Sequence, residues 1–312
     1  MFDKISLKAK INIDDIDTIV LKNYLEQCTQ GDEVYYKSTA YANFDGVFIE
    51  IRGDTLKCKC SICKLCYKAA TGKLDNSKPM TFARAVRTIK ELLLRLCVEA
   101  HNVVITYYEI GITMKLNRPA VDYIHEVNEI SDRILWNDAN FPSYRQKTTE
   151  KSKHYKKVLK IYDKTFEANE KGRNVESNII RIETTYKHQS VKLLDLIDNA
   201  NLAKLSKIFF EDWSNLSFYR EISTKCVKMS QLEKAREIKQ LGVEAYRERY
   251  KRLYLDRRIT KKQWETIRNF ARSWPETQSD YIEEVGPLEK EFKTKLLNQF
   301  QTAHIIPYKR KV

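Results

Sequence analysis

Glycine and proline are scarce in this sequence, which has eight glycines and six prolines among 312 residues. Both residues interrupt regular structure, so their scarcity predicts helices and strands joined by short loops. Long apolar runs are missing as well. No stretch approaches the roughly 18 apolar residues that a membrane span requires, and the first residues lack the apolar segment of a signal peptide. These absences argue against a membrane protein and predict a cytoplasmic one.

What the sequence has in excess is positive charge. Lysine and arginine number 56 against 42 aspartate and glutamate residues, a formal net charge of +14. Such a balance favours a polyanionic partner, although a ribosome-associated or merely basic protein would share it. The hydrophobic fraction of 42% supports a globular fold, and the length allows two domains.

Two segments with alternating polar and apolar residues stand near the centre of the sequence. Val158–Tyr162 and Asn178–Tyr186 are predicted strands, because side chains along a strand point alternately to opposite faces. A short helix and a loop are expected between them. If the aliphatic residues share a core, the polar ones share the opposite face, namely Lys160, Tyr162, Arg181 and Glu183. A phenol, a carboxylate and two cations on one face favour phosphate chemistry.

The strand predicted over residues 102–117 contains a carboxylate, Glu109, within an apolar run. Carboxylates are depleted in strands and costly to bury, so this exception is expected at a functional site. Glu183 lies on a separate strand, and Glu167 follows Tyr162 by about one helical turn. Two or three carboxylates can hold Mg²⁺ or Mn²⁺ through oxygen. The alternative is that each carboxylate forms an ordinary salt bridge.

Four cysteines are clustered between residues 58 and 66. They are Cys58, Cys60, Cys63 and Cys66. Four thiols so close together could hold zinc or an iron–sulfur cluster. A single compact run wraps one ion poorly, however, so free thiols are the favoured interpretation. The lysines interspersed among them suit a surface that faces DNA in either case.

Basic residues accumulate between Ser131 and Tyr155, among them Arg145, Lys147 and Lys153. This segment is expected to be an exposed loop or hairpin that reaches toward a ligand, or else an ordinary solvated surface.

Helical patterns dominate after Lys187. Ser230–Glu233 and Thr260–Gln263 have the spacing of capping boxes, the first opening a helix to about Leu255. A last helix is expected from about Glu276 to Phe300, either continuous or broken at Gly286-Pro287. We therefore expect two domains, residues 1–215 and an all-helical part, residues 216–312, that binds DNA or forms oligomers.

Three segments in this order resemble a known family. They are Tyr-Glu-Ile-Gly-Ile at 108–112, Leu-Lys-Ile-Tyr-Asp-Lys-x-x-Glu at 159–167 and Ile-Ile-Arg-Ile-Glu at 179–183. Their order and spacing are similar to those of rolling-circle replication initiators, in particular the filamentous-phage gene II protein and its relatives in bacterial plasmids. The resemblance covers about residues 40–200 and includes Ser-Ile-Cys-Lys at 61–64.

The resemblance implies roles for individual residues. Tyr162 matches the nucleophile that nicks DNA, and Lys164 matches a further polar position of the same motif. Glu109, Glu183 and Glu167 match acidic positions that would hold Mg²⁺ or Mn²⁺. The sequence departs from the family in having Cys63 where relatives often have histidine. None of its five histidines forms the His-x-His motif of the wider superfamily, so the ligand set differs from the usual one.

The implied activity is nicking of one strand at a phage or plasmid origin. Tyr162 would become a 5′-phosphotyrosine, and the freed 3′-hydroxyl would prime a polymerase. The expected contacts to DNA come from Lys160, Arg181, Arg145, Lys147 and Lys153. Expected partners are single- and double-stranded origin DNA, a host helicase or polymerase, and a second copy of the chain.

The expected fold is an α+β nickase domain with an antiparallel sheet, resembling HUH endonucleases without the His-x-His motif, followed by the helical part. Two other functions stay open. One is an origin-binding initiator without catalysis, whose binding would be indifferent to metal. The other is a cysteine-cluster zinc protein that binds RNA.

Overall fold

Antiparallel strands form the framework of the molecule. The computed structural model describes residues 2–39, 46–76, 80–131, 133–148, 157–173, 175–218, 229–280 and 285–304. The strands are β1 (Phe2–Lys10), β2 (Glu26–Gln30), β3 (Glu33–Lys37), β4 (Phe48–Arg52), β5 (Thr55–Ser61), β6 (Val103–Lys115), β7 (Val127–Ile130), β8 (Arg133–Asn137), β9 (Arg145–Thr148), β10 (Lys157–Asp163), β11 (Ile179–Tyr186), β12 (Val191–Lys192) and β13 (Leu216–Phe218). They pair in the order β13-β7-β8-β9-β10-β11-β6-β1-β5-β4-β3-β2, and β12 pairs with β6. The expected α+β class with an antiparallel sheet is confirmed.

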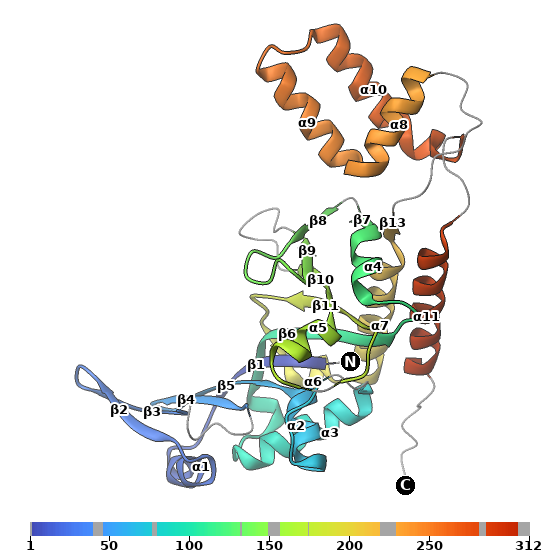
Figure 1. The fold of residues 1–312 in the computed structure, drawn as a ribbon. Coiled ribbons are helices and arrows are strands. Elements are labelled where there is room, and N and C mark those ends of the chain that lie inside the picture. Colours follow the sequence, from blue (N-terminus) through green and yellow to red (C-terminus); the bar gives the residue numbers. More distant parts are fainter. Residues whose placement is uncertain are drawn as a thin grey trace.

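Helices lie between and after the strands (Figure 1). They are α1 (Ile16–Asn23), α2 (Ile62–Thr71), α3 (Phe82–Arg95), α4 (Ala120–Glu126), α5 (Lys164–Glu170), α6 (Leu193–Leu196), α7 (Asn199–Ser214), α8 (Met229–Leu241), α9 (Val243–Leu255), α10 (Lys261–Thr277) and α11 (Pro287–His304). Among the described residues, no helix is both long enough and apolar enough to cross a bilayer.

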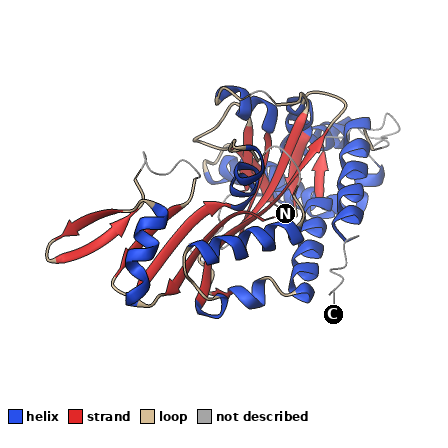
Figure 2. Ribbon diagram, turned by 90° about the horizontal axis from the view of Figure 1, so that it is seen from below, coloured by secondary structure: helices blue, strands red, loops and turns tan. Residues whose placement is uncertain are grey.

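One face of the central strands packs on helices. Phe2 of β1 meets Phe82 of α3 edge to face, with ring centroids 5.2 Å apart. On β11, Thr184 accepts a hydrogen bond of 3.2 Å from the indole of Trp213 in α7. The alternation within each strand therefore leaves the other face for polar residues. Figure 2 shows the strands side by side in one twisted layer, with helices against it.

The segment predicted as strand, short helix, loop and strand has this structure. β10 is followed directly by α5, whose N-cap is Asp163; its carboxylate accepts a hydrogen bond from the Phe166 amide. β10 then pairs with β11 in antiparallel register, with Lys160 opposite Glu183 and Tyr162 opposite Arg181. Residues directly opposite each other share a face, so the predicted common face of these four polar side chains is confirmed.

The basic segment after Ser131 contains a hairpin in its described part. β8 and β9 pair with each other, and β9 adds to the edge of β10. Lys153 lies outside the described residues.

Helices α8 to α10 have a core of their own, built around Ala235, Ile238, Tyr246, Ile267 and Trp274. The last helix, α11, instead returns to the sheet, where Phe292 and Leu296 join the main core. Its Phe300 lies 4.8 Å from Phe210 of α7, measured between ring centroids.

The C-terminal part differs from the predicted one in three respects. Strand β13 lies at its start and pairs with β7, so residues after 215 are not all helical. The single helix expected from Ser230 to Leu255 is wrong: Gly242, at φ +80°, separates α8 from α9, and Ser230 lies inside α8. The last helix begins at Pro287 rather than Glu276, because α10 continues to Thr277. The capping box at Thr260 and Gln263 is confirmed.

Candidate active site

A β-bulge in β1 brings the first carboxylate to the polar face. Phe2 pairs with Ile110, but Ile5 pairs with Tyr108, so β1 has one residue more than β6 in this interval. A bulge of this kind re-aims side chains without breaking the sheet. It places Asp3 beside Glu109 on the polar face, although Phe2 and Ile5 both face the core.

Three carboxylates meet at this point of the sheet. Asp3, Glu109 and Glu183 each offer an oxygen, and the three oxygens lie within 4.8 Å of one another. All three residues are buried, with 5–6% of their surface exposed. In the described part of the chain this is the one group of three or more aspartate, glutamate, histidine or cysteine residues close enough to hold a metal ion.

Two cations balance these carboxylates. The Arg181 guanidinium donates from Nε to Glu183 at 2.7 Å and from Nη2 to Asp3 at 2.8 Å, so one side chain bridges two of the acids. Lys160 lies 2.8 Å from Glu109 and 3.7 Å from Glu183. Buried charges are tolerated only when paired and hydrogen-bonded, and this cluster meets that condition.

Tyr162 is hydrogen-bonded to the carboxylate cluster. Its hydroxyl donates a hydrogen bond of 2.8 Å to Oε1 of Glu183, the same oxygen that receives Nε of Arg181. On the other side the Arg145 guanidinium lies 4.7 Å from the centre of the Tyr162 ring. The side chain is 3% exposed.

The environment shifts the ionisation of these groups in different directions. Burial raises the pKa of Tyr162 well above its usual range, and the charge of Glu183 adds to this. Burial opposes ionisation of Glu183 too, but Arg181 and Lys160 outweigh it and lower its pKa. For Asp3, burial raises the pKa, and the neighbouring carboxylates add to it despite Arg181. At neutral pH the phenol is protonated and Glu183 is ionised.

The site can hold a divalent cation. Carboxylate oxygens are the ligands that hard cations prefer. Carboxylates as close as Asp3 and Glu183 repel each other unless a proton or a cation relieves the repulsion. The pKa of Asp3 is raised mainly by burial, and this repulsion adds to the shift. A metal bound to the three acids would serve the same purpose as that proton.

Gly111 gives the cluster the space it needs. It lies directly opposite Glu183, and a Cβ atom there would come within 2.9 Å of Arg181 Nη2 and 3.0 Å of Glu183 Cγ. A side chain at position 111 would therefore displace Arg181 and Glu183, and with Glu183 the acceptor of the Tyr162 hydroxyl.

Glu167, expected as a metal ligand, is not part of the carboxylate group. It lies in α5, where its Oε2 receives Lys164 at 2.5 Å and its Oε1 receives Lys171. These two lysines outweigh the effect of burial and lower the pKa of Glu167 to about 2. Lys164 also donates to Oδ1 of Asn76 at 2.8 Å. The loop residue Asn76 links this pair to the carboxylate cluster, because its backbone carbonyl oxygen accepts a hydrogen bond of 3.2 Å from Arg181.

Two of the residues expected to contact DNA border Tyr162 from β9. Arg145 lies opposite Tyr162, and Lys147 opposite Lys160. Both are near Asp138, at 3.8 and 2.9 Å. Nε of Arg145 is buried without a hydrogen-bond acceptor, so part of this guanidinium is unsatisfied. An unsatisfied donor beside a phenol is suited to a phosphate oxygen.

The clustered cysteines are buried and unbonded to one another. Cys58 and Cys60 face the core from β5, opposite Leu7 and Ile5, and the other two lie in α2. No three of these four sulfurs, all in the described part of the chain, approach closely enough to form a metal site. Burial, together with the charge of Asp3, raises the pKa of Cys63 to about 11, so this thiol is protonated.

Sequence reasoning did not find Asp3, Tyr107 or Asn76. Tyr107 donates its hydroxyl hydrogen bond to Oε1 of Glu109, and its pKa is raised mainly by burial. The alternation within residues 102–117 does place Tyr107 and Glu109 on one face, which was the available signal. Asp3 gave no such signal because its position depends on the bulge.

Comparisons with known proteins find similarity in structure but none in sequence. No family model and no curated protein matches the sequence. Among solved structures, the rolling circle replication initiator protein from Geobacillus stearothermophilus is similar, with 11% identity and a TM-score of 0.40. The match covers 72% of this chain and 88% of that chain. A likeness of this degree does not establish a shared fold or function.

Proposed function

We propose that this protein is a replication initiator that nicks one DNA strand at a phage or plasmid origin, with Tyr162 as the nucleophile. One observation carries the proposal: the Tyr162 hydroxyl is hydrogen-bonded, at 2.8 Å, to a carboxylate of a buried three-acid cluster. The sequence resemblance to rolling-circle initiators, through the motifs around Glu109, Tyr162 and Glu183, points the same way. A phenol beside carboxylates and two buried cations suits transfer of a phosphodiester.

The reaction is a transesterification. The phenolic oxygen of Tyr162 attacks the phosphorus, the bond from phosphorus to the 3′ oxygen breaks, and a tyrosine–5′-phosphate bond replaces it. The phenolic proton moves along the existing hydrogen bond to Glu183, and the departing 3′ oxygen takes a proton from solvent. The number of phosphodiester-type bonds is unchanged, so the same site can later rejoin the strand.

The residues around Tyr162 have different proposed roles. Asp3, Glu109 and Glu183 would hold Mg²⁺ or Mn²⁺, which when bound would polarise the phosphate and stabilise its charge. Arg145, whose Nε is buried without an acceptor beside the Tyr162 ring, would position the phosphate. Arg181 keeps two of the acids oriented, and Lys160 fixes the third.

The test is covalent capture of DNA. Labelled oligonucleotides that tile the replicon encoding the protein are incubated with it and Mn²⁺, then separated by denaturing electrophoresis. We expect one oligonucleotide to give a shifted band, lost with EDTA, whose peptide map places the DNA on Tyr162. Tyr162→Phe should abolish the band, whereas Tyr24→Phe, which removes an exposed phenol outside the carboxylate cluster, should retain it. A band that persists in Tyr162→Phe would overturn the assignment.

An origin-binding initiator without catalysis is the second candidate. It is favoured by the burial of Tyr162, which is 3% exposed and would have to become accessible to DNA. This alternative predicts specific binding to one oligonucleotide or duplex, with equal affinity in Mn²⁺ and EDTA and no covalent product. The experiment above separates the two candidates.

A further inference from the structure

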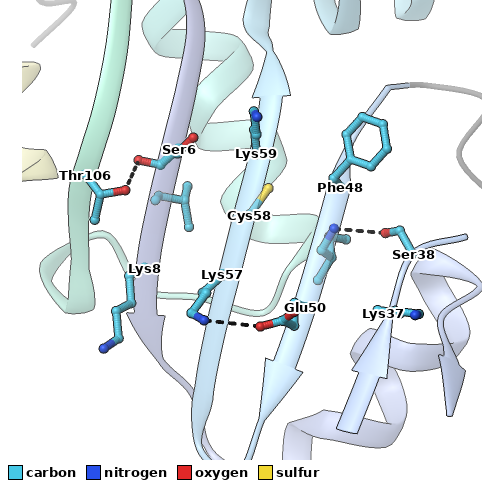
Figure 3. A pocket seen from close by; sticks show the side chains of 12 residues that line it. Ser6, Lys8, Lys37, Ser38, Phe48, Glu50, Lys57, Cys58, Lys59 and Thr106 are labelled. Atoms are coloured by element: carbon cyan, nitrogen blue, oxygen red, sulfur yellow. Dashed lines mark hydrogen bonds and ion pairs between the residues drawn. The ribbon is translucent and has the colours of Figure 1, made fainter. Parts of the chain in front are cut away.

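A shallow groove lies on the polar face of the sheet beyond the acidic cluster. It runs across β1, β5, β4 and β3, and four lysines contribute to its lining, which we call the lysine face: Lys8, Lys37, Lys57 and Lys59. Figure 3 looks onto this face and shows these side chains around Phe48 and Glu50.

Most of this charge is not neutralised. Glu50, the one acidic residue of the lining, lies 3.2 Å from Lys57 and 3.3 Å from Arg52. Within the described residues, no acid forms a salt bridge with Lys8 or Lys59, and both side chains are exposed. Unpaired lysines on an open surface attract a polyanion.

An aromatic ring stands among these lysines. Phe48 lies directly opposite Lys59 in the pairing of β4 with β5, and it is 54% exposed. Its neighbour Ile49 points the other way, into the core. An exposed ring flanked by cations has the composition of a surface on which a base stacks while phosphates meet lysine.

The lysine face is continuous with the acidic cluster. A second register shift lies between Ser6, which pairs with Tyr107, and Leu7, which pairs with Ile105. Ile5 and Leu7 face the core, so Ser6 and Lys8 lie on the opposite face of β1, the face of Asp3. At about 3.3 Å per residue, Lys8 lies roughly 16 Å from Asp3 along the strand. A single strand lying on the groove could reach the site without leaving the sheet.

We propose that the lysine face binds single-stranded DNA next to the nicking site, with phosphates on Lys8, Lys59 and Lys37 and a base stacked on Phe48. The proposal rests on the proposed function, which supplies the DNA. Single-stranded DNA fits better than duplex because duplex bases are stacked internally and offer no free face to the ring. An acidic protein could also pair with the lysines, but it would offer no base to stack on the Phe48 ring.

The experiment measures binding of a fluorescein-labelled dT20 by anisotropy, in EDTA and over a range of salt concentrations. For Lys8→Ala/Lys59→Ala we expect the log–log salt slope to fall by about 1.4 and the Kd at 0.1 M salt to rise roughly 25-fold. For Phe48→Ala we expect a rise of about fivefold to a hundredfold with the slope unchanged, because the ring contacts no phosphate.

The control is Lys90→Ala/Lys204→Ala, which removes two exposed lysines from α3 and α7. It changes the net charge equally and should leave the Kd within about twofold of the wild type. If the lysine-face variants bind dT20 as tightly as this control, the inference is wrong. The inference is also wrong if the Kd of these variants for a labelled 20-base-pair duplex rises as much as their Kd for dT20. In that case the lysine face binds duplex DNA as well.

Adduct formation at Tyr162, measured on the same variants at saturating DNA, keeps the two proposals separate. Absence of an adduct in the wild-type protein counts against nicking and leaves the binding data interpretable. If the lysine-face variants bind dT20 as the wild type does and still form the adduct, the inference about the lysine face is wrong and the proposed nicking activity stands.

Discussion

At the residue scale, Glu183 holds the site together because one of its oxygens serves two donors. Oε1 accepts from both the Tyr162 hydroxyl and Arg181 Nε. Its negative charge is already stabilised by Arg181 and Lys160, which makes it a weak base toward a phenol whose own pKa is raised. Proton transfer therefore requires additional stabilisation of the phenolate, which a bound cation would provide.

Glu167 gives a pH-dependent prediction at the same scale. Its pKa is about 2 in the folded protein against an ordinary 4.5, because Lys164 and Lys171 surround it. A depressed carboxyl pKa stabilises the fold above about pH 4.5, and this contribution is lost as the pH falls toward 2. We expect Glu167→Gln to lower the free energy of unfolding at pH 7 by on the order of 3 kcal/mol.

The measurement is urea unfolding of both proteins between pH 7 and pH 3. The difference between them should shrink steadily below pH 4.5. Glu170→Gln, which alters an exposed residue of the same helix, should match the wild type throughout. A Glu167→Gln deficit that is as large at pH 3 as at pH 7 would show that packing, not charge, is responsible.

At the scale of single elements, the bulge in β1 decides which acid completes the cluster. We expect Asp3→Asn to weaken Mn²⁺ binding at least tenfold, since it removes the charge of one of three ligands. Glu167→Gln, the acid first expected in this role, should bind Mn²⁺ as the wild type does. Isothermal titration of each protein with Mn²⁺ distinguishes them. If Glu167→Gln bound Mn²⁺ more weakly than Asp3→Asn, Glu167 rather than Asp3 would be the metal ligand.

The elements also show how far the sequence could be interpreted. The common face of Lys160, Tyr162, Arg181 and Glu183 was predictable, because the period of two along a strand is a local property. The place of Asp3 was not, since it depends on the register between β1 and β6, about a hundred residues apart in sequence. The break at Gly242 was missed because its flanking residues, taken alone, continue a helical pattern.

At the scale of the whole molecule, helices α8 to α10 form a separate core inserted between β13 and α11. The buried hydrophobic residues of this core are distinct from those of the main core. We expect a variant in which a flexible linker replaces residues 219–286 to remain folded and to retain Mn²⁺ binding. If the helices bind the double-stranded origin, the variant should lose affinity for duplex at least tenfold while keeping its affinity for dT20.

Circular dichroism and anisotropy with both DNA forms test this prediction. Loss of sheet structure in the variant would mean that the helical unit supports the rest of the chain. Equal affinity for duplex in both proteins would leave dimerisation or partner binding as the role of these helices.

The pairing of distant strands also sets when the site can exist. Asp3 is made first, Glu109 follows much later, and Glu183 enters on β11, which pairs with β6. Strands can pair only after they have been synthesised. A growing chain that does not yet include β11 therefore has neither the carboxylate cluster nor a positioned Tyr162. If Tyr162 is the nucleophile that we propose, the protein gains its nicking activity only after about three fifths of its length has left the ribosome.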